Sequence, residues 1–282
     1  METLKPINLL FSLDKNCFDG LLITVLSIAK TTEHPLNIFV ATGSFRNKKK
    51  TFFAFEQSQA DKIENIIRKY NNENRITLID MTDLFQSKLG KSVNLHSKFS
   101  PYTMIRLLSD LEPSFPDRLL YMDIDIVVVK DLYQVFSYDL KDKEIGMIKD
   151  EVGSHWLGKN YCNAGVLLMD IKKLRESHHF DAVRYKVNHN RYFMPDQTAI
   201  NRAMKKYKMI MPGEFNSQHE LSDDTVIRHY CQWIRIHKHG IGNVAKKPWN
   251  VKEFRAFYGE NTHKELLDEF LAIKEQNKKE QQ

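Results

Sequence analysis

The sequence predicts an α/β fold in which a mostly parallel central sheet is flanked by helices. Short apolar runs typical of buried strands alternate with segments of helical periodicity through the first half of the chain. Polar residues stop the apolar runs, as expected of buried strands that open at one edge of a sheet. The length of 282 residues and the apolar content of 42% suit one large globular body.

Each expected element follows from its local pattern. The run from Ile7 to Leu13 is apolar and gives way to the polar Asp14-Lys-Asn16, so it predicts the first central strand. From Phe18 the apolar residues recur at helical spacing until Glu33-His-Pro35 ends the pattern. The same reasoning predicts strands at 36–40, 76–79, 118–122 continued at 126–129, 145–148 and 165–169, and helices at 57–70, 101–111, from 171, and near 197–207.

The end of the chain differs from the rest. Between His263 and Gln282, five apolar residues line one side of a charged helix. We therefore expect one domain over residues 1–258 and a small helical C-terminal region, an amphipathic tail, over 259–282. Two partners are open for its apolar side, the body of the protein and a membrane surface.

The charge balance excludes a typical nucleic-acid binder. The 42 basic and 36 acidic residues give a net charge of only +6. No nucleic-acid partner is expected, and the basic aromatic stretch at 45–53 is interpreted as a solvated loop, with an acceptor lid as the alternative. Positive charge gathers between Arg235 and Lys252, where a pyrophosphate site, an anionic membrane contact and a solvated loop are the alternatives.

The cysteines and the hydropathy of the chain indicate the cellular compartment of the protein. Cys17, Cys162 and Cys231 form no Cys-X-X-Cys pair, so reduced thiols are expected. No run approaches the roughly 18 apolar residues of a membrane span, and the first residues lack a charged leader. The expectation is a cytoplasmic protein, with a peripheral position at the inner face of the membrane left open.

Two carboxylates, Asp123 and Asp125, interrupt an apolar run near the end of an expected strand. Open α/β sheets bind ligands at that edge. Side chains one residue apart alternate faces in a regular strand, so a shared cation requires a bend. The spacing alone is weak, because such acids often only cap or solvate a loop. Burying two unpaired charges among apolar neighbours is costly, however, and this favours a site for Mn²⁺ or Mg²⁺.

With these carboxylates in place, the sequence resembles the retaining glycosyltransferases of family 8. The resemblance covers most of the chain and implies a single GT-A type domain with a Rossmann-like sheet. It also implies transfer of galactose or glucose from a UDP-sugar to a glycan, glycolipid or glycoprotein acceptor, with a bacterial surface glycan such as lipopolysaccharide expected. Its motifs, in order, are Ser12-Leu-Asp14-Lys-Asn16, Tyr102 to Arg106, Leu120-Tyr-Met-Asp-Ile-Asp125, Asn163-Ala-Gly165-Val-Leu-Leu-Met-Asp170, Asp196-Gln197 and Lys247-Pro-Trp-Asn250.

The resemblance gives each matched residue an expected role. Asp123 and Asp125 would hold Mn²⁺ or Mg²⁺, and Asp196 and Gln197 would stand at the catalytic centre. The expected donor-binding residues are Ser12, Leu13, Asp14, Asn16, Arg106, Asp123, Ile124, Asp150, Asn163 and Lys247, with Lys247 as the partner of the diphosphate.

At two positions the chain departs from the family pattern. Cys17 stands where the family usually has an aromatic residue against the uracil, so stacking passes to Phe18 or is weaker. Three histidines, His229, His237 and His239, compete to be the third metal ligand. His239 is the prediction, because Gly242 follows it by three residues and it is nearest to Lys247 in sequence, whereas His229 stands in an apolar, strand-like run.

The resemblance also directs the expected mechanism. It places Gln197 beneath the anomeric carbon, and an amide is a poor nucleophile. We therefore expect same-face attack, in which the departing phosphate oxygen accepts the proton of the acceptor.

Two other functions are alternatives to glycosyl transfer. A sugar-nucleotide pyrophosphorylase usually has a glycine-rich loop after the first strand, and residues 12–18 contain no glycine. An inactive glycan- or nucleotide-binding homologue is the second rival, since fold does not guarantee chemistry. The retained Asp123, Asp125, Gln197 and Lys247 argue against it.

Overall fold

The computed structural model describes residues 4–46, 50–97, 99–231, 234–237, 240–243 and 245–279, with the backbone alone at 234–237 and 240–243. A seven-stranded sheet with the order β10-β8-β9-β6-β1-β2-β5 forms its centre. Its strands are β1 (Ile7–Ser12), β2 (Leu36–Thr42), β5 (Arg75–Asp80), β6 (Arg118–Met122), β8 (Ile145–Lys149), β9 (Cys162–Asp170) and β10 (Lys208–Ile210). All four pairings that leave out β9 are parallel, whereas β9 lies antiparallel between β6 and β8. The mostly parallel sheet predicted from the sequence is confirmed.

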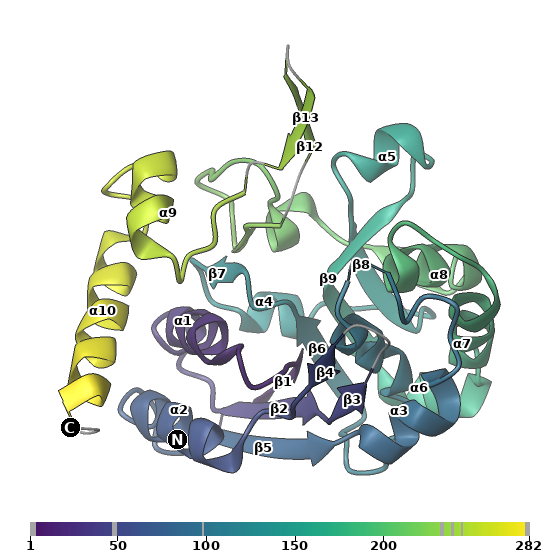
Figure 1. Ribbon diagram of the computed structural model, residues 1–282, viewed down its shortest axis with the longest axis horizontal. Coiled ribbons are helices and arrows are strands. Elements are labelled where there is room, and N and C mark those ends of the chain that lie inside the picture. The colour runs from purple at the N-terminus through teal and green to yellow at the C-terminus, as the bar shows by residue number, and fades with distance from the viewer. Residues whose placement is uncertain are drawn as a thin grey trace.

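Helices cover both faces of this sheet (Figure 1). Strand β1 explains why, because alternate side chains enter different apolar clusters: Leu9 packs on one face and Leu10 on the other. The first cluster takes side chains from α1 (Phe18–Ala29), α2 (Gln57–Ile67), α9 (Val251–Tyr258) and α10 (Lys264–Lys279). The second takes them from α3 (Thr82–Leu89), η1 (Pro101–Leu108), α6 (Ile171–Ser177), α7 (Phe180–His189) and α8 (Pro195–Ala203).

Two expected elements differ from the observed ones. The helix expected at 101–111 is the 3₁₀ helix η1, which ends at Leu108 and whose N-terminus is capped by the Ser100 side chain. The strand expected to continue through 126–129 is a separate strand, β7 (Ile126–Val128), outside the main sheet. It pairs antiparallel with β11 (Ile227–His229), because the chain bends after β6 and carries β7 away. This pairing sets His229 directly opposite Ile126.

Short elements that the sequence pattern did not predict complete the chain. They are β3 (Phe45–Arg46), β4 (Thr51–Phe52), α4 (Tyr133–Phe136), α5 (Gly153–Trp156), η2 (Gly213–Asn216), β12 (Ile234–His237) and β13 (Gly240–Asn243), besides α3, α7, α9 and β10. Most have fewer than six residues, too few for a periodicity to be read.

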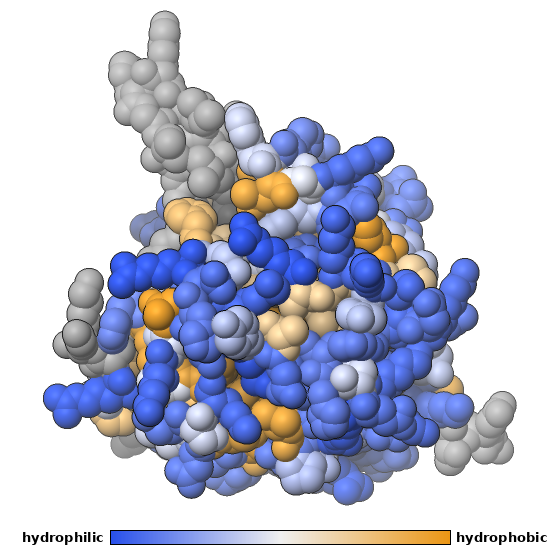
Figure 2. All heavy atoms as spheres, turned by 90° about the vertical axis from the view of Figure 1, so that its right-hand side faces the viewer, coloured by the Kyte–Doolittle hydropathy of each residue, from blue (hydrophilic) through white to orange (hydrophobic). Residues whose placement is uncertain are grey.

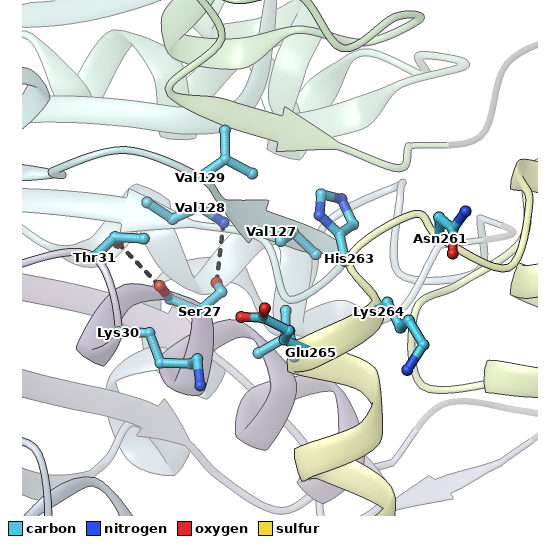
Figure 3. Close-up of a pocket in the computed structure, with 11 residues that line it drawn as sticks. Ser27, Lys30, Thr31, Val127, Val128, Val129, Asn261, His263, Lys264 and Glu265 are labelled. Atoms are coloured by element: carbon cyan, nitrogen blue, oxygen red, sulfur yellow. Dashed lines mark hydrogen bonds between the residues drawn. The ribbon is translucent and has the colours of Figure 1, made fainter.

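The C-terminal helix α10 packs on the body. Leu266, Leu267 and Phe270 are buried in the same apolar cluster as α1. Figure 3 shows the start of α10 beside α1 and β7, around a cavity of about 430 Å³. Lys30 of α1 pairs with Glu269 at 2.5 Å. Of the two partners left open for this apolar side, the structure shows the body; the domain boundary at residue 258 stays a prediction.

A search of the described residues finds no helix long and apolar enough to cross a membrane.

Candidate functional site

Two carboxylates and one imidazole meet beyond the end of β6. One ligand atom from each of Asp123, Asp125 and His229 lies within 4.8 Å of the other two. The His229 Nε2 atom is 3.0 Å from Asp125 Oδ1 and 3.9 Å from Asp123 Oδ2. The bend between β6 and β7 lets both carboxylates face the same point, as the sequence argument required. We call these three residues the metal cluster, since carboxylate oxygens suit Mn²⁺ or Mg²⁺ and histidine is a common third ligand of divalent cations.

Backbone contacts fix this bend. The Asp123 N–H donates to the Gly165 carbonyl of β9 at 2.8 Å, and the Asp125 carbonyl accepts the Tyr230 N–H at 2.8 Å. The Thr24 hydroxyl of α1 donates to the Ile124 carbonyl at 2.7 Å. Three elements thus hold three consecutive residues, so the carboxylates are positioned before any ligand binds.

A chain of amides sets the orientation of the His229 ring. The Gly165 N–H donates to Asn163 Oδ1 at 2.8 Å, which establishes that this atom is the amide oxygen. Asn216 therefore points its NH₂ at the same oxygen, 3.1 Å away, and its own oxygen at His229 Nδ1, 2.9 Å away. It follows that Nδ1 carries a proton and that Nε2 faces the carboxylates.

This tautomer fits a bound cation. An imidazole lone pair 3.0 Å from the Asp125 carboxylate is repelled unless a proton or a cation lies between the two atoms. A histidine that donates its other ring N–H to a fixed acceptor is the usual arrangement for a metal ligand. His229, Asp123 and Asp125 therefore have the chemistry and orientation of a divalent-cation site.

Gly165 makes room for the imidazole. A Cβ atom at this position would lie 2.2 Å from His229 Cε1, far inside van der Waals contact. Position 165 lies in β9, where its carbonyl accepts the Asp123 N–H and its own N–H donates to Asn163 Oδ1, each at 2.8 Å, so its backbone is held in place. The glycine of the Asn163-Ala-Gly165 motif is thus explained by close packing on a metal-cluster residue.

Lys247 places a positive charge beside the Asp125 carboxylate. Its Nζ donates to Asp125 Oδ2 at 2.5 Å and to the Tyr230 carbonyl at 2.8 Å. Burial alone would raise the pKa of Asp125, but the adjacent charges of Lys247 and His229 outweigh it and hold that pKa well below its usual range. Asp125 is therefore anionic at neutral pH.

The residues expected around the donor sugar come together beside the metal cluster. The buried guanidinium of Arg106 donates to Asp123 Oδ1 at 3.0 Å and lies 3.4 Å from Asp196 Oδ2. Gln197 is held at both ends of its amide: Oε1 accepts the Ala164 N–H at 3.1 Å, and Nε2 donates to Asp150 Oδ2 at 3.0 Å. Burial raises the pKa of Asp196, against the charge of Arg106.

Those residues line one cavity. Its volume is about 700 Å³, within the roughly 300–1,000 Å³ common for ligand sites. Every member of the metal cluster lines it, as do six more of the residues expected at the donor site or the catalytic centre: Arg106, Asp150, Asn163, Asp196, Gln197 and Lys247. The cavity of Figure 3 contains no metal-cluster residue.

The residues expected to contact the uridine lie at the end of β1. Strand β1 runs parallel to β6 with Leu10 beside Tyr121, so Ser12 and Asp123 follow at the same edge of the sheet. Leu13 is buried, and the Asp14 carboxylate accepts the Asn16 N–H at 2.9 Å. None of Ser12, Leu13, Asp14 and Asn16 lines the cavity around the metal cluster.

The predicted third ligand, His239, lies outside the described residues, and the side chain of His237 is likewise not described. Sequence reasoning set His229 aside because of its apolar neighbours. In the structure those neighbours form the β7–β11 ribbon that carries His229 to the carboxylates. Asn216 was missed altogether, since no local pattern connects it with the metal cluster.

This fold and site define a glycosyltransferase: the chain belongs to glycosyl transferase family 8, whose model matches residues 8–253. The family resemblance seen in the sequence is thereby confirmed. The chain is similar to the lipopolysaccharide 1,2-glucosyltransferase of Escherichia coli (strain K12), with 25% identity over 273 residues that cover 89% of this chain and 75% of that protein. The lipopolysaccharide 1,3-galactosyltransferase of Salmonella typhimurium (strain LT2) is 21% identical over 269 residues, covering 86% and 73%.

Solved structures confirm the fold. The galactosyltransferase LgtC, solved in complex with donor and acceptor sugar analogues, superposes with a TM-score of 0.64 at 20% identity, covering 95% of both chains. The glycosyltransferase GlyE of Streptococcus pneumoniae TIGR4 has a TM-score of 0.61 at 19% identity, covering 95% of this chain and 63% of that one. The α/β domain is of GT-A type, as expected from the resemblance.

Proposed function

We propose that this protein transfers galactose or glucose from a UDP-sugar to a saccharide acceptor of a bacterial surface glycan such as lipopolysaccharide, with retention of anomeric configuration and with Mn²⁺ or Mg²⁺. The observation that carries the proposal is the metal cluster at one wall of the cavity that Arg106, Asp196 and Gln197 also line. Its relatives in lipopolysaccharide synthesis support the choice of sugar and acceptor. We also propose a cytoplasmic location.

The cation would be held by Asp123, Asp125 and His229, the last in place of His239. When bound, it would neutralise the donor diphosphate and stabilise it as a leaving group. The two carboxylates and the imidazole favour Mn²⁺ over Mg²⁺, because Mg²⁺ prefers ligand sets of oxygen alone.

Lys247 would stabilise the departing diphosphate. Its ammonium already lies against Asp125, so a diphosphate bound at the metal cluster comes within its reach. A fixed positive charge there stabilises the transition state more than the ground state, since negative charge grows on the leaving oxygen.

Gln197 and Asp196 would hold the donor sugar. Both ends of the Gln197 amide are already hydrogen-bonded, and the Asp196 carboxylate is engaged by Arg106. Neither group is free to act as a strong nucleophile, which favours same-face attack with the leaving phosphate oxygen as proton acceptor. A sugar trapped covalently on either residue would contradict this mechanism.

The first test is donor hydrolysis. Purified protein is incubated with Mn²⁺ and each of several UDP-sugars, and UDP release is compared with that of Asp125→Ala and of Asp142→Ala, an exposed control. Release from one UDP-sugar that disappears only in Asp125→Ala would support the proposal and identify the donor.

Other results point to the rival functions. Pyrophosphate formed from UTP and a sugar phosphate would indicate a pyrophosphorylase. No UDP release, joined by no calorimetric UDP binding, would indicate an inactive binding homologue.

A further inference from the structure

Exposed apolar side chains gather around the cavity of the metal cluster. Trp156 is 81% exposed, Phe193 67% and Leu157 62%, and all three line that cavity. Among the described large hydrophobic residues only Tyr185, at 64%, is comparably exposed. Single exposed apolar residues are ordinary on protein surfaces, but a group at one cavity indicates a binding surface.

Two different elements carry these side chains. Trp156 ends α5, in the excursion between β8 and β9 that begins near Asp150 and returns at Asn163. Phe193 lies between α7 and α8, three residues before Asp196. Figure 1 shows α5 and α8 on the same side of the molecule, and Figure 2, which turns that side to the viewer, shows hydrophobic groups set among hydrophilic ones. Both aromatic rings are thus anchored close in sequence to donor-sugar residues.

Polarity changes from one part of the cavity to another. The buried part carries charged and amide groups, among them Asp196, Arg106 and Gln197, whereas the exposed part carries Trp156 and Phe193. A cavity of about 700 Å³ is larger than one hexose, so a donor sugar at the buried end leaves the aromatic end for a second ligand.

A saccharide is a suitable second ligand for the aromatic end of the cavity. A hexose ring has an apolar C–H face, which packs on an aromatic ring, and a rim of hydroxyls that seek polar partners. Gln218 and His219 line the same cavity, and His219 lies 3.1 Å from the Glu151 carboxylate. A lipid chain would bury this ion pair against apolar atoms, whereas sugar hydroxyls can add hydrogen bonds to it. Tryptophan and phenylalanine are rigid, so holding a ligand costs them little side-chain entropy.

We propose that Trp156 and Phe193 form a stacking platform that binds the sugar ring of the acceptor, and that the group received at this platform is a saccharide and not a lipid chain. The proposal rests on the proposed transferase function and extends it to the acceptor. The platform orients the acceptor hydroxyl toward the donor, whose diphosphate would be bound by the cation that Asp123, Asp125 and His229 would hold.

Saturation-transfer NMR of the full chain with UDP and diamagnetic Mg²⁺ tests this proposal. The probes are the methyl glycosides of galactose, glucose and lactose. We expect at least one to receive saturation mainly at its ring C–H protons. Trp156→Ala and Phe193→Ala should each weaken its binding about tenfold. Trp156→Phe and Phe193→Tyr keep a ring and should restore binding to within about threefold, and Tyr185→Ala, an equally exposed aromatic outside the cavity, should have no effect.

Several results would overturn the platform. They are saccharide binding that does not depend on the two rings, no saccharide binding at all, or an equal loss in Tyr185→Ala. Co-sedimentation with phosphatidylglycerol–phosphatidylethanolamine vesicles that depends on Trp156 would show a lipid-binding surface instead.

Failure of the proposed function is distinguishable. UDP release by the unsubstituted protein without ring-dependent saccharide binding would remove the platform alone. Ring-dependent saccharide binding without UDP release from any donor would remove the transferase and leave the platform.

Discussion

Replacing Asn216 by Ala tests how the structure holds the metal cluster. Its amide oxygen faces His229 Nδ1 at 2.9 Å and its NH₂ faces Asn163 Oδ1 at 3.1 Å, with the side chain almost wholly buried. The substitution removes both contacts and leaves the imidazole free to rotate or to change tautomer. We expect weaker Mn²⁺ binding although no ligand atom is lost.

The size of the effect follows from the two lost bonds. Losing a partner that orients a metal-ligating histidine commonly costs about 10–100-fold in metal affinity. That range equals about 1.4–2.8 kcal/mol, similar to the about 1–3 kcal/mol for one buried polar group left without a partner. Because His229 Nδ1 loses its partner and Asn163 Oδ1 loses one of its two, a decrease in folding stability is expected as well.

Calorimetric titration of Mn²⁺, in the absence of donor, measures the affinity without relying on activity. Asn74→Ala is the matched control: Asn74 is equally buried, accepts the Leu36 N–H and donates to the Ile67 carbonyl, away from the cluster. It should lower stability and leave the Mn²⁺ affinity unchanged. Asn216→Asp keeps an oxygen facing His229 and should retain more affinity than Asn216→Ala.

Two results would refute this reasoning. One is Mn²⁺ affinity in Asn216→Ala within about twofold of the original protein. The other is an equal loss of affinity in Asn74→Ala, which would attribute the effect to general destabilisation.

Three further predictions follow. His229→Ala should abolish Mn²⁺-dependent UDP release and His239→Ala should retain it, and the reverse pattern in the same assay would restore the sequence-based choice. Gly165→Ala should displace the His229 ring, weaken Mn²⁺ at least tenfold in calorimetry and lower the melting temperature, because its Cβ would lie 2.2 Å from Cε1; unchanged values would contradict that packing. Burial lowers the pKa of His263 to about 4, and the charge of Arg228 adds to the shift. An unfolded histidine titrates near ~6.5, so folding stability should be constant above that pH and fall by up to about 3 kcal/mol between ~6.5 and ~4 as the unfolded state takes up the proton. Urea unfolding at several pH values measures this dependence. The folding stability of His263→Gln should fall less between ~6.5 and ~4 than that of His189→Gln, and an equal fall would contradict the assignment.

Local sequence patterns were enough to predict the fold class. Strand β1 could be predicted because both of its faces are buried, which leaves a continuous apolar run ended by Asp14. Asp123 and Asp125 stood out because carboxylates are unusual among apolar neighbours, and parallel strands end at a common edge. Helix α10 was recognised from its one apolar side.

Other features depend on contacts between distant segments. The antiparallel direction of β9 and the departure of β7 from the sheet follow from pairings that no local periodicity contains. The partner of the apolar side of α10 could not be predicted for the same reason, since an apolar side does not specify what packs on it.

The third member of the metal cluster, His229, was not found from the sequence. Local spacing favoured His239, whereas the structure brings His229 to Asp125 across 104 positions of sequence. An apolar setting argues against a ligand when the sequence is read alone, yet burial in the β7–β11 ribbon is what fixes the ring. The sequence by itself determined the fold class, the two carboxylates and the family. Tertiary structure brought His229 to the carboxylates and Asn216 to its ring, because pairing of distant strands, and not spacing, places those groups together.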